Sequence, residues 1–271
     1  MATVLSEAPS LPALFARAAL TSRGRGGELP DTHLARTGVT VDPARLADYA
    51  RVCRSGLTGA LPVTFPYVLT FPLALPGLVH VRNRITQVRP IAVPEALDLE
   101  VWAERFARHR SGATVDLVAS VRSAGDEVWH SRSTYLVRGG TAPEGAPEAD
   151  VDVPVGEVEG VAARWRVPAD AGRRYARVSG DVNPIHLSGL SAKAFGFKRA
   201  IAHGMWVKAR ALAALEGRLP DALTVDVGFR KPLFLPSTVV LSTAARDGGW
   251  DLAVRNEKTG TEHLVGVVRP V

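Results

Sequence analysis

Asp181 and His186 stand five residues apart in the segment Gly-Asp-Val-Asn-Pro-Ile-His, which carries the strongest chemical signal in the chain. Pro184 disfavours helical geometry at Asn183, and Gly180, Asp181 and Asn183 are turn formers. The spacing therefore predicts a compact turn that presents a carboxylate and an imidazole to a common point. Because histidine titrates near neutral pH, such a pair is suited to general acid/base catalysis.

A second group follows at Ile201-Ala202-His203-Gly204-Met205. Apolar residues recur every three or four positions from Ile201 to Leu215, which predicts a mostly apolar helix that begins near Gly204, with Gly217 as its C-terminal cap. Free N–H groups at the start of a helix stabilise an oxygen that gains negative charge, and glycine leaves room for it to approach. We interpret His203 as a hydrogen-bonded partner near the helix start rather than as a second base.

Taken together, Asp-x-Asn-Pro-x-His, Gly-Phe and Ile-x-His-Gly-Met resemble the MaoC-like dehydratase family, which includes the (R)-specific enoyl-CoA hydratases. The motif spans residues 175–206, and the rest of the chain is similar to two-repeat members such as the mycobacterial 3-hydroxyacyl-thioester dehydratases. The resemblance implies an α+β double hotdog fold, in which an antiparallel sheet wraps around one long apolar helix. It also implies that Asp181 and His186 are catalytic and that Gly204 forms an oxyanion hole.

An internal repeat predicts two copies of one fold. Tyr49-Ala50-Arg51-Val52 is identical to Tyr175-Ala176-Arg177-Val178, and in each half an apolar segment and a basic residue with Pro-x-x-x-Pro follow in the same order. The predicted organisation is an N-terminal extension (1–40), a first copy (41–138), an acidic linker (139–160) and a catalytic copy (161–271). The first copy lacks the Asp-x-Asn-Pro-x-His motif and is interpreted as degenerate.

Alternating apolar residues and turn signals predict four strands in each copy. One long helix for four or more strands favours an antiparallel α+β fold. Organised structure is expected from about Val41, where Asp42 and Pro43 form a helix start. The predicted strands are 78–85, 97–107, 113–121 and 127–137, then 223–229, 238–245, 250–256 and 262–268.

In the first copy, the position of the long helix is broken by prolines in LPVTFPYVLTFPLALPG. The resemblance implies that this disrupted segment makes room for the acyl chain of a substrate. The hypothesis is that Phe65, Tyr67 and Phe71 set the preferred chain length.

Charge points to an anionic ligand. The chain has 33 Lys and Arg against 27 Asp and Glu, a formal charge of +6, which suits a CoA nucleotide or an acidic carrier protein. The sequence contains neither a basic helix nor an interleaved row of aromatic residues, so it does not indicate nucleic-acid binding.

The linker holds six acidic residues and no basic one, and it is predicted to be solvated. Candidate substrate-binding residues are the turn residue Asn183 and, for phosphate contact, Lys198, Arg199, Arg230 and Lys231.

Cofactor and targeting signals are weak. The histidines show no HxxxH or HExxH spacing, and there is no phosphate-cradling glycine loop, so no metal or redox cofactor is expected. The lone Cys53 excludes an internal disulfide and suits a reducing cytoplasm. The start MATVLSEAPS lacks a basic n-region, so no signal peptide is expected. The uncharged stretch 55–79 contains four prolines, which favours a buried core segment over a membrane span.

The predicted activity is that of a hydro-lyase that hydrates a trans-2-enoyl thioester, such as an acyl-CoA, to the (R)-3-hydroxyacyl thioester, or catalyses the reverse in fatty-acid metabolism. CoA or phosphopantetheine is then part of the substrate. His186 takes a proton from water, Asp181 orients the water and can deliver the proton to Cα, and the Gly204 N–H holds the enolate-like oxygen.

Three alternatives stay open. The first is a dehydratase acting on acyl carrier protein in fatty-acid or polyketide synthesis. The second is a hotdog thioesterase, which the Asp-x-Asn-Pro-x-His turn disfavours. The third is a non-catalytic partner of a synthase that binds acyl thioesters. A monomer in which two repeats form a pseudo-dimer and a homodimer are both compatible with the repeat.

Overall fold

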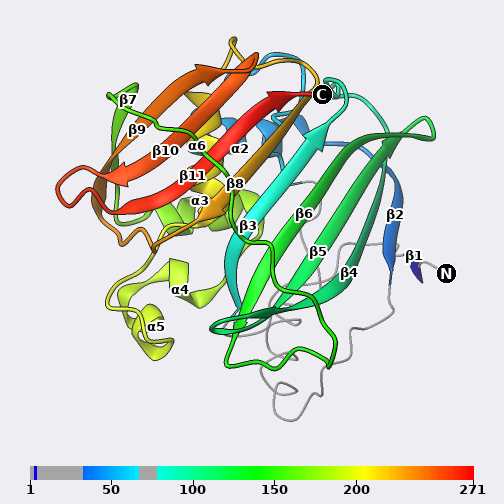
Figure 1. The fold of residues 1–271 in the computed structure, drawn as a ribbon. Coiled ribbons are helices and arrows are strands. Elements are labelled where there is room, and N and C mark those ends of the chain that lie inside the picture. The colour runs from blue at the N-terminus through cyan, green and yellow to red at the C-terminus, as the bar shows by residue number, and fades with distance from the viewer. Residues whose placement is uncertain (1–2, 5–32, 67–77) are drawn as a thin grey trace.

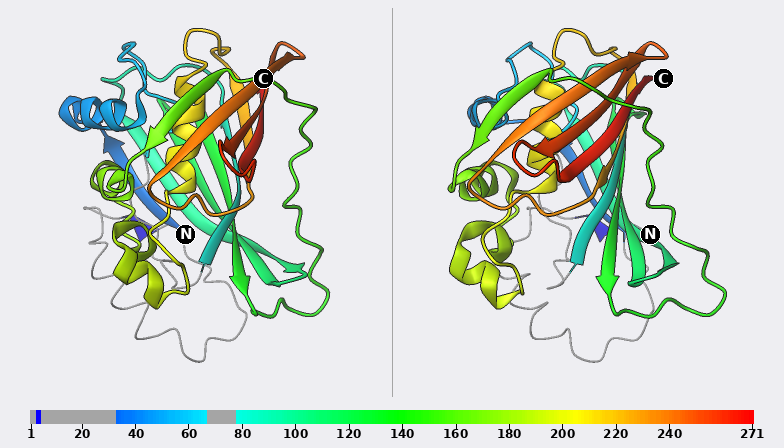
Figure 2. Two further views of the ribbon diagram at one scale, coloured as in Figure 1. Left: turned by 90° about the vertical axis from the view of Figure 1, so that its left-hand side faces the viewer. Right: turned by 60° about the vertical axis from the view of Figure 1, so that its left-hand side comes forward.

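The structure, a computed structural model, describes residues 3–4, 33–66 and 78–271. The described part forms one eleven-stranded sheet that curves around helix α6 (Gly204–Ala213) (Figures 1 and 2). The other helices are α2 (Pro43–Cys53), α3 (Ala171–Ser179), α4 (Pro184–Leu187) and α5 (Gly189–Ala194). None of the helices in these ranges is both long enough and apolar enough to span a membrane.

Strand order makes the two copies visible. The strand order is β1-β2-β4-β5-β6-β3-β8-β11-β10-β9-β7. Outward from the central pair β3 and β8, the order β3-β6-β5-β4-β2 in the first half corresponds to β8-β11-β10-β9-β7 in the second. The strands of the first half are β1 (Thr3–Val4), β2 (Leu34–Val39), β3 (Leu78–Gln87), β4 (Leu97–His109), β5 (Gly112–Ser123) and β6 (Asp126–Arg138). Those of the second half are β7 (Ala163–Val167), β8 (Leu223–Phe229), β9 (Ser237–Arg246), β10 (Gly249–Asn256) and β11 (Glu262–Pro270). The predicted two-copy antiparallel α+β architecture is confirmed.

All eight predicted strands are present, and their observed bounds extend the predicted ones by at most two residues at each end. Two further strands occupy equivalent places: β2 precedes α2, and β7 precedes α3. β2 pairs with β4 through Leu34↔Val101 and Val39↔Leu97. The predicted start of organised structure near Val41 is therefore wrong, because the first copy already includes β2, which begins at Leu34. β2 is largely half-buried or exposed, so its sequence lacks a clear alternation of apolar and polar residues.

Helix α2 has the predicted start. The Asp42 carboxylate accepts a hydrogen bond from the Ala44 N–H at 2.9 Å, and Pro43 occupies the first turn. The repeated tetrapeptides place Tyr49 on α2 and Tyr175 on α3, and the two helices pack together with these rings 6.3 Å apart. The repeated tyrosines therefore bring the two copies into contact, and within the first copy the Tyr49 hydroxyl donates to the Thr64 carbonyl at 2.7 Å.

Helix α6 is buried nearly all round, as expected of a helix enclosed by a sheet. One continuous hydrophobic core extends over both copies and includes Ile85 from the first and Leu212 and Leu252 from the second. The helix ends at Ala213, earlier than predicted. Tight turns follow it, including a Leu215 N–H bond to the Leu212 carbonyl at 2.9 Å, and Gly217 ends these turns with φ of 75°.

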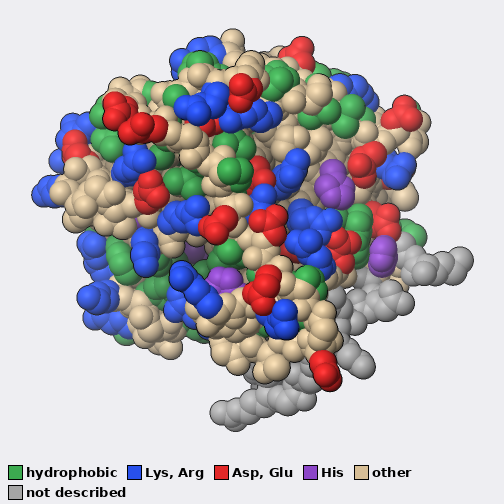
Figure 3. All heavy atoms as spheres, in the orientation of Figure 1, with side chains coloured by type: hydrophobic (Ala, Val, Ile, Leu, Met, Phe, Trp, Pro, Cys, Tyr) green, Lys and Arg blue, Asp and Glu red, His purple; other side chains and the backbone are tan. Residues whose placement is uncertain are grey.

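The segment 139–160 is largely exposed, as its composition predicts, but it also packs on the sheet. It crosses the outer face of the sheet, where Asp150 pairs with Arg82 of β3 at 2.8 Å and Asp152 pairs with Arg230 at 3.0 Å (Figure 1). Val153 is 4% exposed. Acidic and basic side chains are interspersed across this face (Figure 3). The acidic residues of the linker therefore match arginines of the sheet, which composition alone does not reveal.

Part of the proline-broken segment of the first copy, residues 67–77, lies outside the described residues, and with it Tyr67 and Phe71. Phe65 is described and is buried. The chain-length hypothesis stays a prediction.

Candidate active site

The predicted turn lies between α3 and α4. Gly180 ends α3 with φ of 76°, a left-handed conformation that favours glycine. The Asp181 carboxylate accepts from the Asn183 N–H at 3.2 Å, and Asn183 in turn caps α4. Asn183 therefore has the structural role expected of a turn residue, and its assignment to substrate binding stays a prediction.

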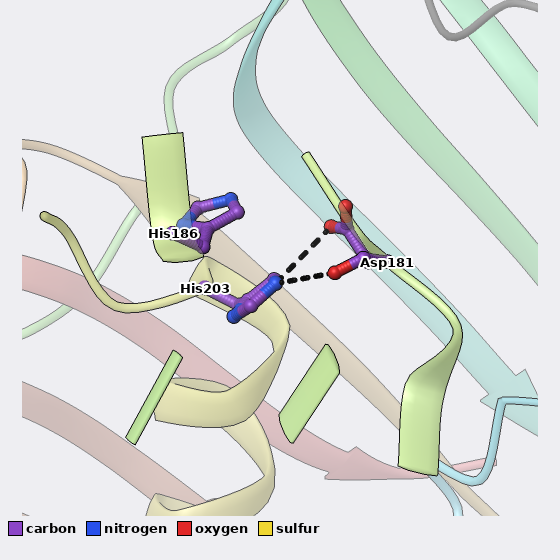
Figure 4. Close-up of side chains that lie close together, drawn as sticks. All are labelled: Asp181, His186 and His203. Atoms are coloured by element: carbon purple, nitrogen blue, oxygen red, sulfur yellow. Dashed lines mark hydrogen bonds and ion pairs between the residues drawn. The ribbon is translucent and has the colours of Figure 1, made fainter. Parts of the chain in front are cut away.

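His186 is held in a defined orientation. Its Nδ1 lies 2.9 Å from the Ile201 carbonyl, and its ring stacks on that of His203 with the centroids 3.6 Å apart (Figure 4). Because a carbonyl can only accept, Nδ1 carries the proton in the neutral ring, and Nε2 keeps a lone pair. The neutral tautomer is therefore that of a general base acting through Nε2.

His203 is a hydrogen-bonded partner, as predicted. Its Nε2 donates to the Asp181 carbonyl at 3.0 Å and lies 3.7 Å from the Asp181 carboxylate (Figure 4). Its Nδ1 is buried and has no hydrogen-bond partner among the described residues. Tyr175 packs against the ring at 4.9 Å. His203 thus holds the Asp181 turn against the start of α6, and its remaining nitrogen is not accessible to act as a base.

Electrostatics favour a charged aspartate beside neutral histidines. Burial, opposed by Asp181, lowers the pKa of His186. Burial and the neighbouring His186 lower the pKa of His203 to about 3. Burial works against ionisation of Asp181, but His203, His186 and the Asn183 N–H outweigh it, and the net pKa of Asp181 is lowered. The Asp181 side chain stays half exposed, at 50%, so the carboxylate remains open to a ligand.

Asp181, His186 and His203 also form a group that could hold a metal ion, since one ligand atom from each lies within 4.8 Å of the others. Both histidines already use one nitrogen to bond a backbone carbonyl. A metal bound there would compete with these hydrogen bonds for the histidine nitrogens. The expectation of a metal-free site stays a prediction.

Gly204 begins α6 beside this pair. His203, the N-cap residue, makes no side-chain capping bond, and the first-turn N–H groups have no partner within the helix. A Cβ at Gly204 would lie 2.8 Å from the Phe229 ring. The absence of a side chain is therefore needed for packing and also leaves the N–H groups open to an anionic oxygen.

The first copy contributes a wall that the sequence did not predict. His80 of β3 stacks on Tyr135 of β6 at 4.4 Å and packs against Phe229 at 4.7 Å. The charge of Asp181 acts on both His80 and Tyr135, which places them near the carboxylate. A β-bulge between His80 and Arg82 turns these residues to opposite faces of the sheet. No sequence signal marks this bulge.

The predicted phosphate-binding residues do not form one group. Lys198 and Arg199 are exposed in the loop before Ile201, where Arg199 lies over the Phe234 ring at 5.6 Å. Arg230 lies on the outer face of the sheet, paired with Asp152, whereas Phe229 faces the site. The structure therefore places Arg230 away from the catalytic turn. Lys231 is exposed, and its carbonyl accepts a bond from His263.

Comparisons with known proteins agree with this geometry. Residues 140–266 match the model of the MaoC like domain. The chain is 40% identical over 257 residues to 3-hydroxyacyl-thioester dehydratase X of Mycobacterium tuberculosis, covering 90% of this chain and 91% of that protein.

Solved structures give the fold. The crystal structure of that mycobacterial protein matches with a TM-score of 0.77 at 39% identity, over 88% of this chain and 100% of that one. A second M. tuberculosis protein, described as a double hotdog fold, matches with a TM-score of 0.50 at 16% identity, over 85% of this chain and 91% of that one. The double hotdog fold expected from the resemblance is confirmed, and the chain belongs to the MaoC-like dehydratase family.

Proposed function

We propose that the protein is a hydro-lyase that interconverts trans-2-enoyl and (R)-3-hydroxyacyl thioesters, without a metal or redox cofactor. The observation that carries the proposal is the bond between His186 Nδ1 and the Ile201 carbonyl, which leaves Nε2 as a base next to an ionised Asp181 and the start of α6. The similarity to a relative named as a 3-hydroxyacyl-thioester dehydratase supports the same chemistry.

In the hydration direction, a water molecule held by the Asp181 carboxylate gives a proton to His186 Nε2, and its oxygen bonds to Cβ of the enoyl group. The Gly204 N–H stabilises the negative charge that forms on the thioester oxygen. The lowered pKa of Asp181 leaves it without a proton in the resting enzyme, which argues against its predicted role as the donor to Cα. The proton taken up by His186 is then the one delivered to Cα, so that one water is added overall.

The proposal is tested by following the loss of enoyl-thioester absorbance with crotonyl-CoA and with a longer enoyl-CoA. We expect His186→Ala or Asp181→Asn to lower kcat by about 10²- to 10⁴-fold because each removes an acid/base group. His263→Ala is the matched control: His263 has a similar burial and also bonds a carbonyl through Nδ1, and this variant should keep kcat within about twofold. A folded double variant of Asp181 and His186 with near wild-type turnover would contradict the mechanism.

A second candidate substrate is a thioester carried by an acidic protein. Leu190 on α5 is 84% exposed, and the neighbouring Lys193, Lys198 and Arg199 are exposed basic residues close to the catalytic turn in sequence. An exposed apolar side chain among cations suits an acidic partner with an apolar contact. Turnover of the same enoyl group on CoA and on acyl carrier protein separates the two substrates, and a higher kcat/KM on the carrier would favour this one.

A further inference from the structure

Lys208, in the middle of α6, is completely buried at 0% exposure. Its Nζ donates to the Asn83 side-chain oxygen at 2.6 Å, to the Val225 carbonyl at 3.2 Å and to the Asn83 carbonyl at 3.4 Å. Three acceptors match the three N–H bonds of an ammonium group. Buried lysines are rare unless they are paired, yet the nearby Asp226 bonds to Arg82 rather than to Lys208. Within the described residues, the Lys208 ammonium therefore has no contacting carboxylate.

The acceptors come from both copies of the fold. Asn83 lies on β3 and Val225 on β8, the two strands that pair at the centre of the sheet. Asn83 is itself fixed, because its amide donates to Ser131 at 3.1 Å and to Ser133 at 3.0 Å. Lys208 thus ties α6 to the seam between the copies.

Lys208 also lies close to the helix start. It follows Gly204 by four residues, about 6 Å along the axis, and helical side chains tilt toward the N-terminus. Gly204 meets Phe229 at one end of β8, whereas Lys208 bonds Val225 further along the same strand. The tilt brings the ammonium group from the middle of α6 toward the helix start, at the seam between β3 and β8.

A positive charge in this place opposes the helix dipole, which is itself positive at the N-terminus. The combination becomes favourable when a negative oxygen forms above the first turn. The electric field of Lys208 reaches His80, near the start of α6. Burial is the largest cause that lowers the pKa of His80 to about 3, and the charge of Lys208 is the second. His80 packs against Phe229, the ring that contacts Gly204.

We propose that Lys208 is a positioning residue of the reaction, whose buried ammonium fixes the first turn of α6 on the seam between the copies and adds its field to the Gly204 N–H. The inference rests on the proposed hydro-lyase function and concerns the same oxyanion. Lys208 acts through the helix and does not touch the substrate.

The charge of Lys208 has a testable dependence on pH. Burial, opposed by Asp226, lowers its pKa to about 7. The charged or titratable groups that interact with it are Asp226 on β8, whose charge acts on Lys208, and His80 on β3, on which the charge of Lys208 acts. With a pKa of about 7, Lys208 changes charge near neutral pH. As pH rises through its pKa, the ammonium loses its proton, and kcat falls.

The first experiment measures kcat and KM of the wild type and Lys208→Met from pH 6 to 9 with an enoyl-CoA. We expect Lys208→Met to lower the kcat plateau at least about tenfold, with KM within about threefold, and to lose the alkaline decline. Arg210→Met is the matched control: it removes a cation from the same helix, but Arg210 faces Cys53 and Trp165, so the wild-type pH profile should persist. A folded Lys208→Met variant with wild-type kcat or an unchanged alkaline decline overturns the proposal.

If Lys208→Met does not fold, a second variant tests the role of Lys208. Asn83→Asp keeps the shape and places a carboxylate against Nζ, while the serine hydroxyls can rotate to donate to it. An opposite charge favours the ammonium form, so the alkaline decline should move up by at least about one pH unit, and the plateau should fall because the field is partly neutralised. An unmoved decline overturns the role of Lys208 alone. If the wild-type protein turns over none of the thioesters, the proposed function is overturned. The inference about Lys208 then falls as well, because it rests on that function.

Discussion

Gly204 contacts the Phe229 ring so closely that any Cβ would come within 2.8 Å of two ring carbons. Phe229 in turn packs on His80, so a side chain at Gly204 must displace the wall of the site or the helix start. We expect Gly204→Ala to lower kcat by about 10- to 10²-fold, less than complete loss of an oxyanion donor, because the N–H is moved and not removed. The same absorbance assay measures this effect.

Gly189 provides the control for this prediction. It also begins a helix, but a Cβ there meets nothing within 4 Å, so Gly189→Ala should leave kcat unchanged. Combining Gly204→Ala with Phe229→Leu should restore part of the activity if steric displacement is the cause. Equal kcat for Gly204→Ala and the wild type would remove Gly204 from the mechanism.

The residues of the candidate site could be predicted because they lie within one short motif, whereas the residues that support them could not. Asp181, His186 and His203 are close in the sequence, and the turn between them follows from Asn183 and Pro184. Lys208 bonds a residue 125 positions away, and His80 reaches the site only through a β-bulge. Such contacts depend on strand register, which local patterns do not specify.

Among the elements, the strands with clear alternation were predicted closely, and the two at corresponding outer positions in the halves, β2 and β7, were missed. β2, LARTGV, shows no clear apolar alternation, whereas β7, ARWRV, alternates but is only five residues long. The exposure of the linker could be predicted from its composition, but its docking could not. The arginines that pair with Asp150 and Asp152 lie far away in the sequence.

The docked linker makes a prediction about stability. Val153 is buried beside Gly228 of β8, so Val153→Asp should lower the free energy of unfolding by at least about 2 kcal/mol, through lost apolar burial and a desolvated carboxylate. Asp152→Asn, one residue away, removes an ion pair whose carboxylate is 87% exposed and should cost less than about 1 kcal/mol. Urea unfolding measures both. Equal effects of the two changes would mean that the linker does not pack on the sheet in solution.

At the scale of the whole molecule, the two copies share a sheet and a core, so we expect them to unfold as one unit. The repeat could be predicted from the identical tetrapeptides, but the pairing of β3 with β8 could not, since either copy could have offered another edge. The seam is closed on the outer face by Arg82, which bonds both carboxylate oxygens of Asp226 at 3.0 and 2.7 Å. Both side chains are largely buried, at 13% and 8% exposure.

Removing one partner of this pair leaves the other as an uncompensated buried charge. We therefore expect Arg82→Met to lower the free energy of unfolding by about 3–5 kcal/mol. Because the core is continuous across the seam, far-UV circular dichroism and tryptophan fluorescence should still report a single coincident transition. Arg84→Met, an exposed position two residues along the same strand, should change stability by less than about 1 kcal/mol. Two separate transitions in Arg82→Met would mean that this pair, rather than the shared core, joins the copies into one cooperative unit.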